Sequence, residues 1–146
     1  MIVTLCGSVR FEPDFHVANL ELAHRGIICY TLVVFPCIGA DPSERGAPLD
    51  ADYDKIMLDL GYMRKIVASD AVLVLGDGYI GRSTSREILW AHMTGRRLVH
   101  QADVVNGGRL PWDDIERLLR STDIKIHNAL DMEFCLVRDA RKVLGV

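Results

Sequence analysis

The chain alternates short apolar runs with segments of helical periodicity, and this alternation limits the folds that it can adopt. The apolar runs are rich in β-branched residues, as buried strands are, and cover residues 2–6, 27–35, 70–75 and 97–100. Between them, apolar residues recur at helical spacing over residues 13–26, 52–67 and 84–94. Strands that alternate with helices pair in parallel through right-handed crossovers. The sequence therefore predicts an α/β fold, a three-layer Rossmann-like (flavodoxin-like) sandwich with a mainly parallel sheet of four or five strands.

The length of 146 residues fits one domain with a sizeable core. We expect a single domain over residues 1–146, with its motifs within residues 1–100 and a C-terminal helical extension over 110–146. Helices are predicted in that extension at residues 112–120 and near 130–144. Residues 36–50 carry three prolines and two glycines, which predicts a long loop of the kind that is often functional.

Composition excludes several classes of protein. Charged residues make up 25% of the chain and the formal net charge is −3, which argues against a nucleic-acid-binding surface. The four cysteines form no C-x-x-C pair and the five histidines show no metal spacing, so we expect reduced thiols and neither a metal nor a cofactor. The N-terminus lacks a basic signal region, and no apolar run approaches the roughly 18 residues of a membrane span. These features predict a soluble cytoplasmic protein.

Polar residues follow two of the predicted strands at the point where each strand ends. Residues 7–10 read Gly-Ser-Val-Arg, and residues 76–87 read Gly-Asp-Gly-Tyr-Ile-Gly-Arg-Ser-Thr-Ser-Arg-Glu. Ligands of open parallel sheets bind beyond the carboxyl ends of the strands. Glycines let backbone amides approach an anion, hydroxyls and a guanidinium add donors, and the next helix presents free N–H groups. The two segments together suit one phosphate group.

A structural explanation competes with this one. Thr84 and Glu87 fit the capping box T-x-x-E, in which Thr84 caps the helix and Glu87 reaches back to the amide of the cap. Ser8 can likewise cap a turn, and Arg10 can be a solvated surface residue. The capping box leaves Tyr79 without a role, together with Gly81, Ser83 and Arg86.

Three segments together resemble the nucleoside 2-deoxyribosyltransferase-like superfamily. They are Thr4-Leu5-Cys6-Gly7-Ser8-x-Arg10-Phe11, then Met63-Arg64-Lys65-Ile66 with Ser69-Asp70-Ala71-Val72-Leu73-Val74, then Gly78-Tyr79-Ile80-Gly81-x-Ser83-Thr84-x-Arg86-Glu87-Ile88. The resemblance covers about residues 1–100. The superfamily includes the 2'-deoxynucleoside 5'-phosphate N-hydrolases and the cytidylate N-glycosidases. The combination of the three segments is more specific than any one of them.

The resemblance implies that Glu87 is a nucleophile, because its position matches the glutamate that attacks the sugar in that superfamily. A carboxylate can stabilise oxocarbenium character at C1' or form a glycosyl ester, as in retaining glycosidases. The implied reaction is hydrolysis of the N-glycosidic bond of a (deoxy)nucleoside 5'-monophosphate, which releases the free base and (deoxy)ribose 5-phosphate. Two alternatives remain: a deoxyribosyltransferase with a base as acceptor, and a nucleotide-binding sensor without turnover.

The resemblance also implies a phosphate pocket. Its counterparts here are Gly7, Ser8, Arg10 and Ser83, with Arg82, Ser85 and Arg86 as further candidates. The chain has Gly81 where transferases acting on free nucleosides tend to carry an aspartate, and this departure favours a nucleotide. We expect the substrate-binding set to comprise Cys6, Gly7, Ser8, Arg10, Phe11, Tyr79, Gly81, Ser83 and Thr84, with Trp90 as a further aromatic candidate.

A leaving base needs a proton, and three residues are candidates for the general acid. Asp59 and Tyr62 lie on the predicted helix before the third strand, where relatives place an aspartate, and Asp77 follows that strand. A solvated helix face for Asp59 and a turn for Asp77 are the structural alternatives. Relatives complete their active sites across a dimer, so the resemblance also implies a homodimer or a higher homo-oligomer that binds a small-molecule nucleotide or nucleoside.

Overall fold

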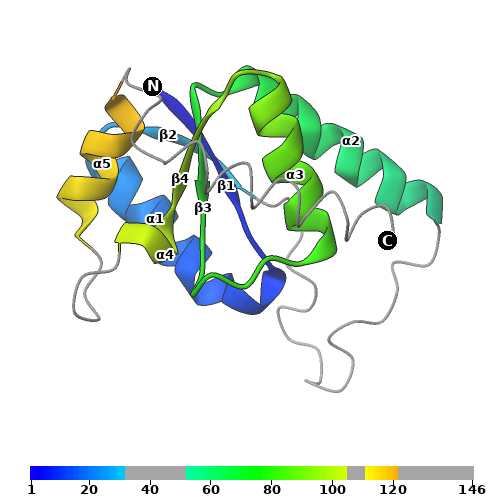
Figure 1. The fold of residues 1–146 in the computed structure, drawn as a ribbon, viewed down its shortest axis with the longest axis horizontal. Coiled ribbons are helices and arrows are strands. Elements are labelled where there is room, and N and C mark those ends of the chain that lie inside the picture. Colours follow the sequence, from blue (N-terminus) through cyan, green and yellow to red (C-terminus); the bar gives the residue numbers. More distant parts are fainter. Residues whose placement is uncertain (32–51, 105–110, 122–146) are drawn as a thin grey trace.

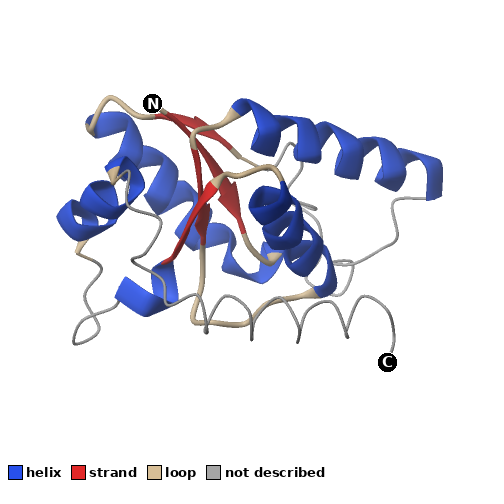
Figure 2. Ribbon diagram, turned by 45° about the horizontal axis from the view of Figure 1, so that its top comes forward, coloured by secondary structure: helices blue, strands red, loops and turns tan. Residues whose placement is uncertain are grey.

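Among the residues that the structure describes, a four-stranded parallel sheet forms the centre of the fold (Figures 1 and 2). The computed structural model describes residues 1–31, 52–104 and 111–121. Within these ranges the strands are β1 (Ile2–Cys6), β2 (Ile28–Tyr30), β3 (Ala71–Val74) and β4 (Arg97–His100). They lie in the order β2-β1-β3-β4, and each neighbouring pair is parallel. The predicted α/β class with a parallel sheet is confirmed.

The strand order determines where a ligand can bind. The chain runs from β1 outward to β2 on one side, and it then returns to β3 and continues to β4 on the other side. The direction of winding therefore reverses between β1 and β3. In open parallel sheets, ligands bind at the carboxyl ends of the strands that flank such a reversal. Cys6 and Val74 are partners in the β1–β3 register, so the segments that follow them leave the sheet side by side.

Helices cover both faces of the sheet. They are α1 (Glu12–His24), α2 (Asp52–Ala68), α3 (Arg82–Met93), α4 (Gln101–Val104) and α5 (Trp112–Arg120), and the short 3-10 turn η1 (Val9–Phe11) precedes α1. Figures 1 and 2 show α1 and α5 on one face, and α2 and α3 on the other. This arrangement is the predicted three-layer sandwich.

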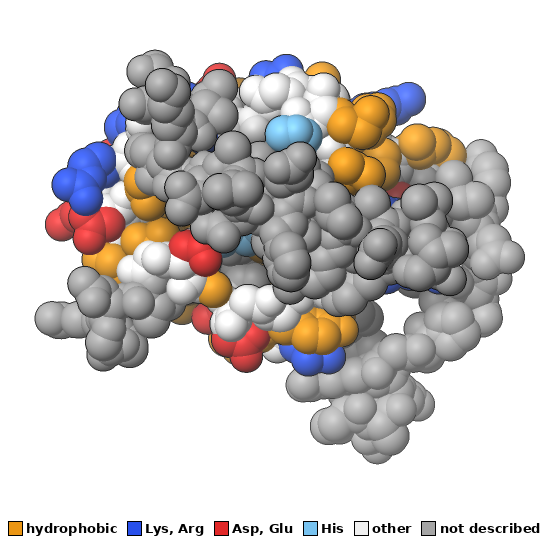
Figure 3. All heavy atoms as spheres, viewed as in Figure 1, with side chains coloured by type: hydrophobic (Ala, Val, Ile, Leu, Met, Phe, Trp, Pro, Cys, Tyr) orange, Lys and Arg blue, Asp and Glu red, His pale blue; other side chains and the backbone are white. Residues whose placement is uncertain are grey.

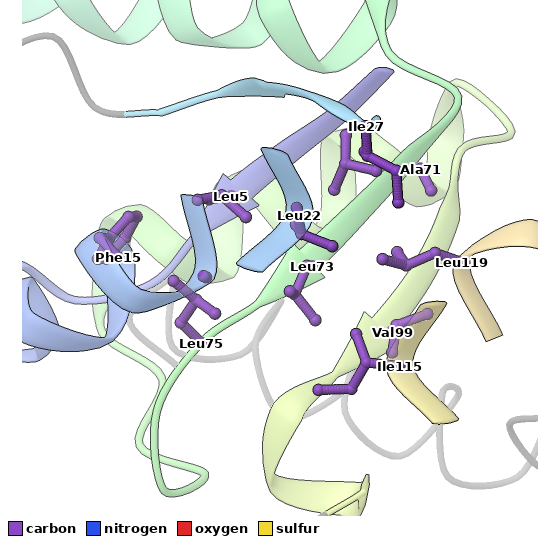
Figure 4. Packing of buried hydrophobic residues seen from close by; sticks show 12 residues of the cluster. Leu5, Phe15, Leu22, Ile27, Ala71, Leu73, Leu75, Val99, Ile115 and Leu119 are labelled. Atoms are coloured by element: carbon purple, nitrogen blue, oxygen red, sulfur yellow. The ribbon is translucent and has the colours of Figure 1, made fainter. Parts of the chain in front are cut away.

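One face of the sheet packs against α1 and α5 through an apolar cluster. Side chains alternate along a strand, so every second residue points to the same face. Leu5 and Leu73 point to this face and meet α1 and α5 in a cluster whose buried members are Val3, Leu5, Phe15, Ala18, Leu22, Ile27, Ala71, Leu73, Leu75, Val99, Ile115 and Leu119 (Figure 4). We call this set the α1/α5 cluster.

The opposite face packs against α2 and α3 through a second cluster. Its buried members are Cys6, Tyr62, Ile66, Val72, Val74, Ile80, Ile88, Ala91 and Leu98, and we call this set the α2/α3 cluster. Trp90 packs against it as a partly buried residue. The α2/α3 cluster therefore includes the thiol of Cys6 and the phenol of Tyr62.

Ion pairs join α1 and α5 at the surface. The guanidinium of Arg25, just after α1, lies 2.6 Å from a carboxylate oxygen of Glu21, 3.1 Å from one of Asp113 and 3.3 Å from one of Glu116. The hydrogen bonds to Asp113 and Glu21 raise the pKa of Arg25, so it stays protonated. In the space-filling view, acidic and basic side chains lie together over α5 at the left edge (Figure 3). Asp113 is exposed and Glu116 is partly buried, and ion pairs of this kind near the surface add little stability.

The observed helices and strands lie where the sequence predicts them, but some of their bounds differ. The strands over residues 2–6 and 97–100 and the helix over 112–120 lie where they are predicted. The strand predicted over residues 27–35 ends at Tyr30, and residues 32–35 lie outside the described part. The predicted loop over residues 36–50 and the helix near 130–144 also lie outside it.

The sequence predicts that the apolar residues spaced along residues 52–67 face the core, and this prediction is wrong in part. Met57, Leu60 and Val67 belong to this apolar stripe, and they are exposed on α2. Among the α2 side chains that the structure describes, from residue 57 onward, Tyr62 and Ile66 are buried against the sheet. Tyr62, which is a predicted candidate for the general acid, thus lies in the core.

Candidate active site

The loops after β1 and β3 contact each other at the carboxyl end of the sheet. The guanidinium carbon of Arg10 lies 3.7 Å from the centre of the Tyr79 ring, a cation–π contact. The ring of Phe11 meets Tyr79 edge to face, with 6.5 Å between the ring centres. Ser8 caps η1, because its hydroxyl accepts a hydrogen bond of 3.4 Å from the amide of Arg10. Ser8 therefore has the turn-capping role that competed with phosphate binding.

Gly76 allows this close approach of the two loops. It adopts a φ of +107°, which glycine reaches without strain, and a Cβ atom added there would overlap the ring of Phe11. Its amide donates a 2.7 Å hydrogen bond to the side-chain oxygen of Gln101, which is itself buried. Gln101, the first residue after β4, thus fixes the start of the β3 loop.

The helix that carries Glu87 begins earlier than predicted. The capping box required Thr84 to be the N-cap, but α3 begins at Arg82 and its N-cap is Gly81, without a side-chain cap hydrogen bond. Thr84 lies buried in the first turn, and Glu87 lies in the second turn, too far along the helix for the capping box. The hydroxyl of Ser85 instead donates a 3.0 Å hydrogen bond to the carbonyl of Gly81. The capping explanation of Glu87 is therefore wrong.

Glu87 lines a pocket between α2 and α3. Asp59 and Met63 line it from α2, and Ser83, Arg86 and Glu87 line it from α3. The Oε2 atom of Glu87 is buried at this recess. Two carboxylates, one guanidinium and one hydroxyl therefore share a small recess. A carboxylate held away from bulk water in this way is suited to attack or to stabilise a positive centre.

Cys6 and Tyr62 lie behind Glu87 in the α2/α3 cluster. The hydroxyl of Tyr62 donates a hydrogen bond to the carbonyl of Leu5, which places the phenol against the end of β1. The pKa of Cys6 is raised well above its usual value, first by burial and then by the charge of Glu87 and a hydrogen bond with it. Burial, followed by the charges of Cys6 and Glu87, also raises the pKa of Tyr62. Both groups therefore stay protonated at neutral pH.

The structure divides the predicted site residues into two groups. Asp59, Ser83 and Glu87 share the pocket, and Cys6 and Tyr62 lie in the α2/α3 cluster. The second group forms the loop cluster at the carboxyl end of the sheet and consists of Gly7, Ser8, Arg10, Phe11 and Tyr79.

Asp77 and Gly81 have structural roles in the described residues. The carboxylate of Asp77 accepts a 3.1 Å hydrogen bond from the amide of Tyr79, which is the turn expected as its structural alternative. Gly81 is the N-cap of α3. Of the three candidates for the acid, Asp59 is the one that lines the pocket beside Glu87.

Sequence reasoning missed Met63 and Gln101. Met63 belongs to the predicted apolar stripe of the second helix and to the family pattern, yet it lines the pocket, one helical turn after Asp59. Gln101 carried a usable signal, because it is a polar residue directly after a predicted strand, at the edge where the other two loops were sought.

The described residues contain no group of three or more histidine, cysteine, aspartate or glutamate side chains that could hold a metal ion. Within the same residues, no helix combines the length and the apolar character needed to cross a membrane.

A comparison with solved structures identifies the fold. The chain superimposes on the structure of a 2-deoxyribosyltransferase from the psychrotolerant bacterium Bacillus psychrosaccharolyticus with a TM-score of 0.56, over 80% of this chain and 90% of that chain. The chain has a nucleoside 2-deoxyribosyltransferase-like fold. The two sequences are 14% identical, so the likeness concerns the fold. No family model and no curated protein matches the sequence.

Proposed function

We propose that the protein cleaves the N-glycosidic bond of a (deoxy)nucleoside 5'-monophosphate, with Glu87 as the nucleophile. The observation that carries the proposal is the Glu87 carboxylate, which has a buried oxygen in a recess that it shares with a second carboxylate, Asp59. The fold supports the proposal, because it is that of an enzyme named as a 2-deoxyribosyltransferase. The loss of the capping explanation supports it further, since Glu87 has no part in starting α3.

The reaction needs a nucleophile and an acid. In the first step the Glu87 carboxylate attacks C1', the C1'–N bond breaks, and its electron pair leaves with the base. The base takes a proton from an acid, for which Asp59 is the candidate in the pocket. In the second step an acceptor attacks C1' and releases Glu87 as a carboxylate. Water as acceptor yields (deoxy)ribose 5-phosphate, and a second base yields a new nucleotide.

Two observations bear on the substrate and the acceptor. Ser83 and Arg86 line the pocket and offer a hydroxyl and a guanidinium to a phosphate, which favours a nucleotide, as does Gly81 in place of an aspartate. The second candidate function is transfer to a base, and the similarity to a transferase structure favours it. Arg86 thus favours a nucleotide over a nucleoside whichever acceptor is used, and our first proposal has water as the acceptor.

A panel of nucleosides and nucleoside monophosphates tests the proposal, each incubated with the protein with and without a second base. Free base that appears without an acceptor identifies a hydrolase, and an exchanged base identifies a transferase. Saturable binding without any product identifies a nucleotide sensor and contradicts the proposed activity. Faster turnover of nucleosides than of their monophosphates contradicts the phosphate assignment.

We also propose that the protein acts in the cytoplasm as a homodimer or a higher homo-oligomer. The proposal rests on the family resemblance, in which the active site is completed across a dimer. Sedimentation velocity at assay concentration checks it. A monomer with full activity contradicts a shared site.

A further inference from the structure

Arg10 lies flat on the ring of Tyr79 at the carboxyl end of the sheet. Its guanidinium carbon is 3.7 Å from the ring centre, which is the ordinary contact distance between two carbon atoms. That distance leaves no room for an N–H group to point into the ring, so the planes of the two groups are stacked. The N–H donors of a guanidinium lie in its plane. The stack therefore occupies one face of Arg10 and directs its donors outward, parallel to the ring.

The ring of Tyr79 is itself held in place from three directions. Its amide donates a 3.1 Å hydrogen bond to the carboxylate of Asp77, which closes the turn before it. Phe11 meets the ring edge to face, with 6.5 Å between the ring centres. A Cβ atom added at Gly81 would lie 3.5 Å from the ring, so the ring also borders the N-cap of α3. The surface on which Arg10 rests is thus fixed by the loops after β1 and β3 and by the start of α3.

This support changes what Arg10 loses when it binds a ligand. A long side chain at the surface has many rotamers, and ordering them opposes binding. A stacked guanidinium has lost much of that freedom before the ligand arrives. Among the described residues, no carboxylate forms an ion pair with Arg10, so its positive charge remains available to an anion.

We infer that Tyr79 is a positioning residue, which holds the Arg10 guanidinium in the orientation that binds the 5'-phosphate of the substrate. The inference rests on the proposed function, in which the substrate is a nucleoside 5'-monophosphate. The position of the ring beside Gly81 supports it, because α3 begins there and presents Ser83 and Arg86 to the pocket. The planar fork of an arginine matches the oxygens of a phosphate. Tyr79 therefore favours phosphorylated substrates without touching the phosphate itself.

Proton NMR tests the stack without any substrate. The ring current of an aromatic residue shifts protons that lie over its face to higher field. The Nε–H signal of Arg10, identified by its loss in Arg10→Ala, should lie at higher field than that of the exposed Arg117. It should keep this shift in Tyr79→Phe, which retains the ring, and lose it in Tyr79→Leu. An unchanged Arg10 signal in Tyr79→Leu overturns the inference.

Phosphorus NMR titration with 2-deoxyribose 5-phosphate, a product of the proposed reaction, tests the effect on binding. Tyr79→Leu should weaken binding about twofold to fivefold, the effect of one cation–π contact at an exposed site. Tyr79→Phe should bind as tightly as the parent. Arg10→Ala should weaken binding more than about tenfold, because the charged donors themselves are lost. Arg117→Ala, which removes an exposed positive charge from α5, is the control and should bind like the parent.

The double variant decides whether Tyr79 acts through Arg10. If it does, Tyr79→Leu should cause no further loss of affinity in the Arg10→Ala background. A purely structural role of Tyr79 would give the same loss in both backgrounds, and that result overturns the inference. Affinity that is unchanged in Tyr79→Leu also overturns it, as does a parent that does not bind the sugar phosphate.

Kinetics separate this inference from the proposed function. In an active parent, Tyr79→Leu should raise KM for a nucleoside monophosphate at unchanged kcat, and it should leave KM for the nucleoside unchanged. Binding of 2-deoxyribose 5-phosphate that depends on Arg10 and Tyr79, in a parent that releases no base, supports the inference and contradicts the proposed function. An active parent with the same KM in Tyr79→Leu keeps the proposed function and removes Tyr79 from it.

Discussion

The two faces of the sheet are built from the same strands but for different tasks. Toward α1 and α5, β1 presents Val3 and Leu5, and the α1/α5 cluster contains only hydrocarbon side chains. Toward α2 and α3, the same strand presents Thr4 and Cys6, both buried. The hydroxyl of Thr4 donates a 3.2 Å hydrogen bond to the carbonyl of Lys65, and the Glu87 charge contributes to the raised pKa of Cys6.

This difference shows that strand alternation can separate stability from chemistry within a small protein. Substitutions on the α1/α5 face should change the free energy of unfolding alone. Those on the α2/α3 face should change activity, with or without a change in stability. The following predictions test that division, from the largest expected effect to the smallest.

Glu87→Gln should reduce turnover by about 1,000-fold or more, because a neutral amide can neither attack C1' nor stabilise its positive charge. The melting temperature should stay close to that of the parent, since Glu87 does not cap α3. Thermal melting and a base-release assay measure both effects. Glu21→Gln, which weakens an ion pair of the other face, is the matched control and should keep full activity. Normal turnover in Glu87→Gln would remove the proposed nucleophile.

Leu22→Ala should lower the free energy of unfolding by about 2–5 kcal/mol, the usual loss when a buried leucine leaves a cavity. Leu22 is fully buried in the α1/α5 cluster. Urea titration measures the loss, and kcat of the folded protein should be unchanged. Ile66→Ala, at an equally buried position beside Tyr62, should be as destabilising and should also lower kcat. Equal kcat in the two variants would contradict the division between the faces.

Asp59→Asn should lower kcat about 100-fold if Asp59 protonates the leaving base. Asp77→Asn is the matched control, because its amide oxygen can still accept the hydrogen bond from Tyr79 and keep the turn. The ratio of the two kcat values identifies the acid. A large loss in Asp77→Asn with normal turnover in Asp59→Asn would move the role to the β3 loop.

Gly76→Ala should destabilise the protein by about 2–3 kcal/mol, from strain at a φ of +107° and from overlap with Phe11. Gly26→Ala should cost about 1 kcal/mol, because Gly26 also has a positive φ but a Cβ there meets nothing. Only Gly76→Ala should weaken nucleotide binding, since Gly76 lies between the loops of the site. Urea titration and calorimetry measure the pair. Equal losses of stability in Gly76→Ala and Gly26→Ala would show that the loop with Phe11 moves away from residue 76 at no cost.

Alkaline pH should destabilise the α2/α3 face by up to about 1.4 kcal/mol per pH unit for each ionising group. Burial raises the pKa of Cys6 in the folded protein, so the unfolded chain loses this proton first. Stability is therefore complete below the ordinary thiol pKa of 9.0 and falls as the pH rises above it. Urea titrations between pH 7 and about pH 10 should show a smaller slope in Cys6→Ser, which has no titrating thiol. The same pH dependence of the free energy of unfolding in the parent and in Cys6→Ser would contradict a raised pKa of the Cys6 thiol.

The repeating features of the fold were predictable from the sequence. Alternation of strand and helix patterns is a property of whole segments, so the strand at residues 71–74 and the helix at 112–120 are found within a residue or so. The carboxyl ends of β1 and β3 were also predictable as the place where Arg10 and Tyr79 meet, because parallel strands bring their ends to one edge.

The features that depend on the packing of separate elements were not predictable. The Thr84–Glu87 pattern is local, and it gave the wrong start for α3 because the helix begins after the extended backbone of Gly81. The position of Tyr62 was obscured by exposed apolar residues on the same helix. The α2/α3 cluster joins Cys6 on a strand to Ile88 on a helix that begins much later in the chain. The catalytic roles themselves stay predictions.

The strand order also determines when the sheet can form during synthesis. The centre of the sheet joins β1 to β3, and the hydrogen bond from the Ile2 amide to Asp70 spans 68 residues. At a synthesis rate of about 5–20 residues per second, β1 waits roughly 3–14 s for this partner. During that time β2, an edge strand of three residues, is its available neighbour in the sheet. Of the four described strands, β1 is made before the others and gains its inner neighbour only when β3 emerges, so its apolar residues need protection from aggregation during that interval.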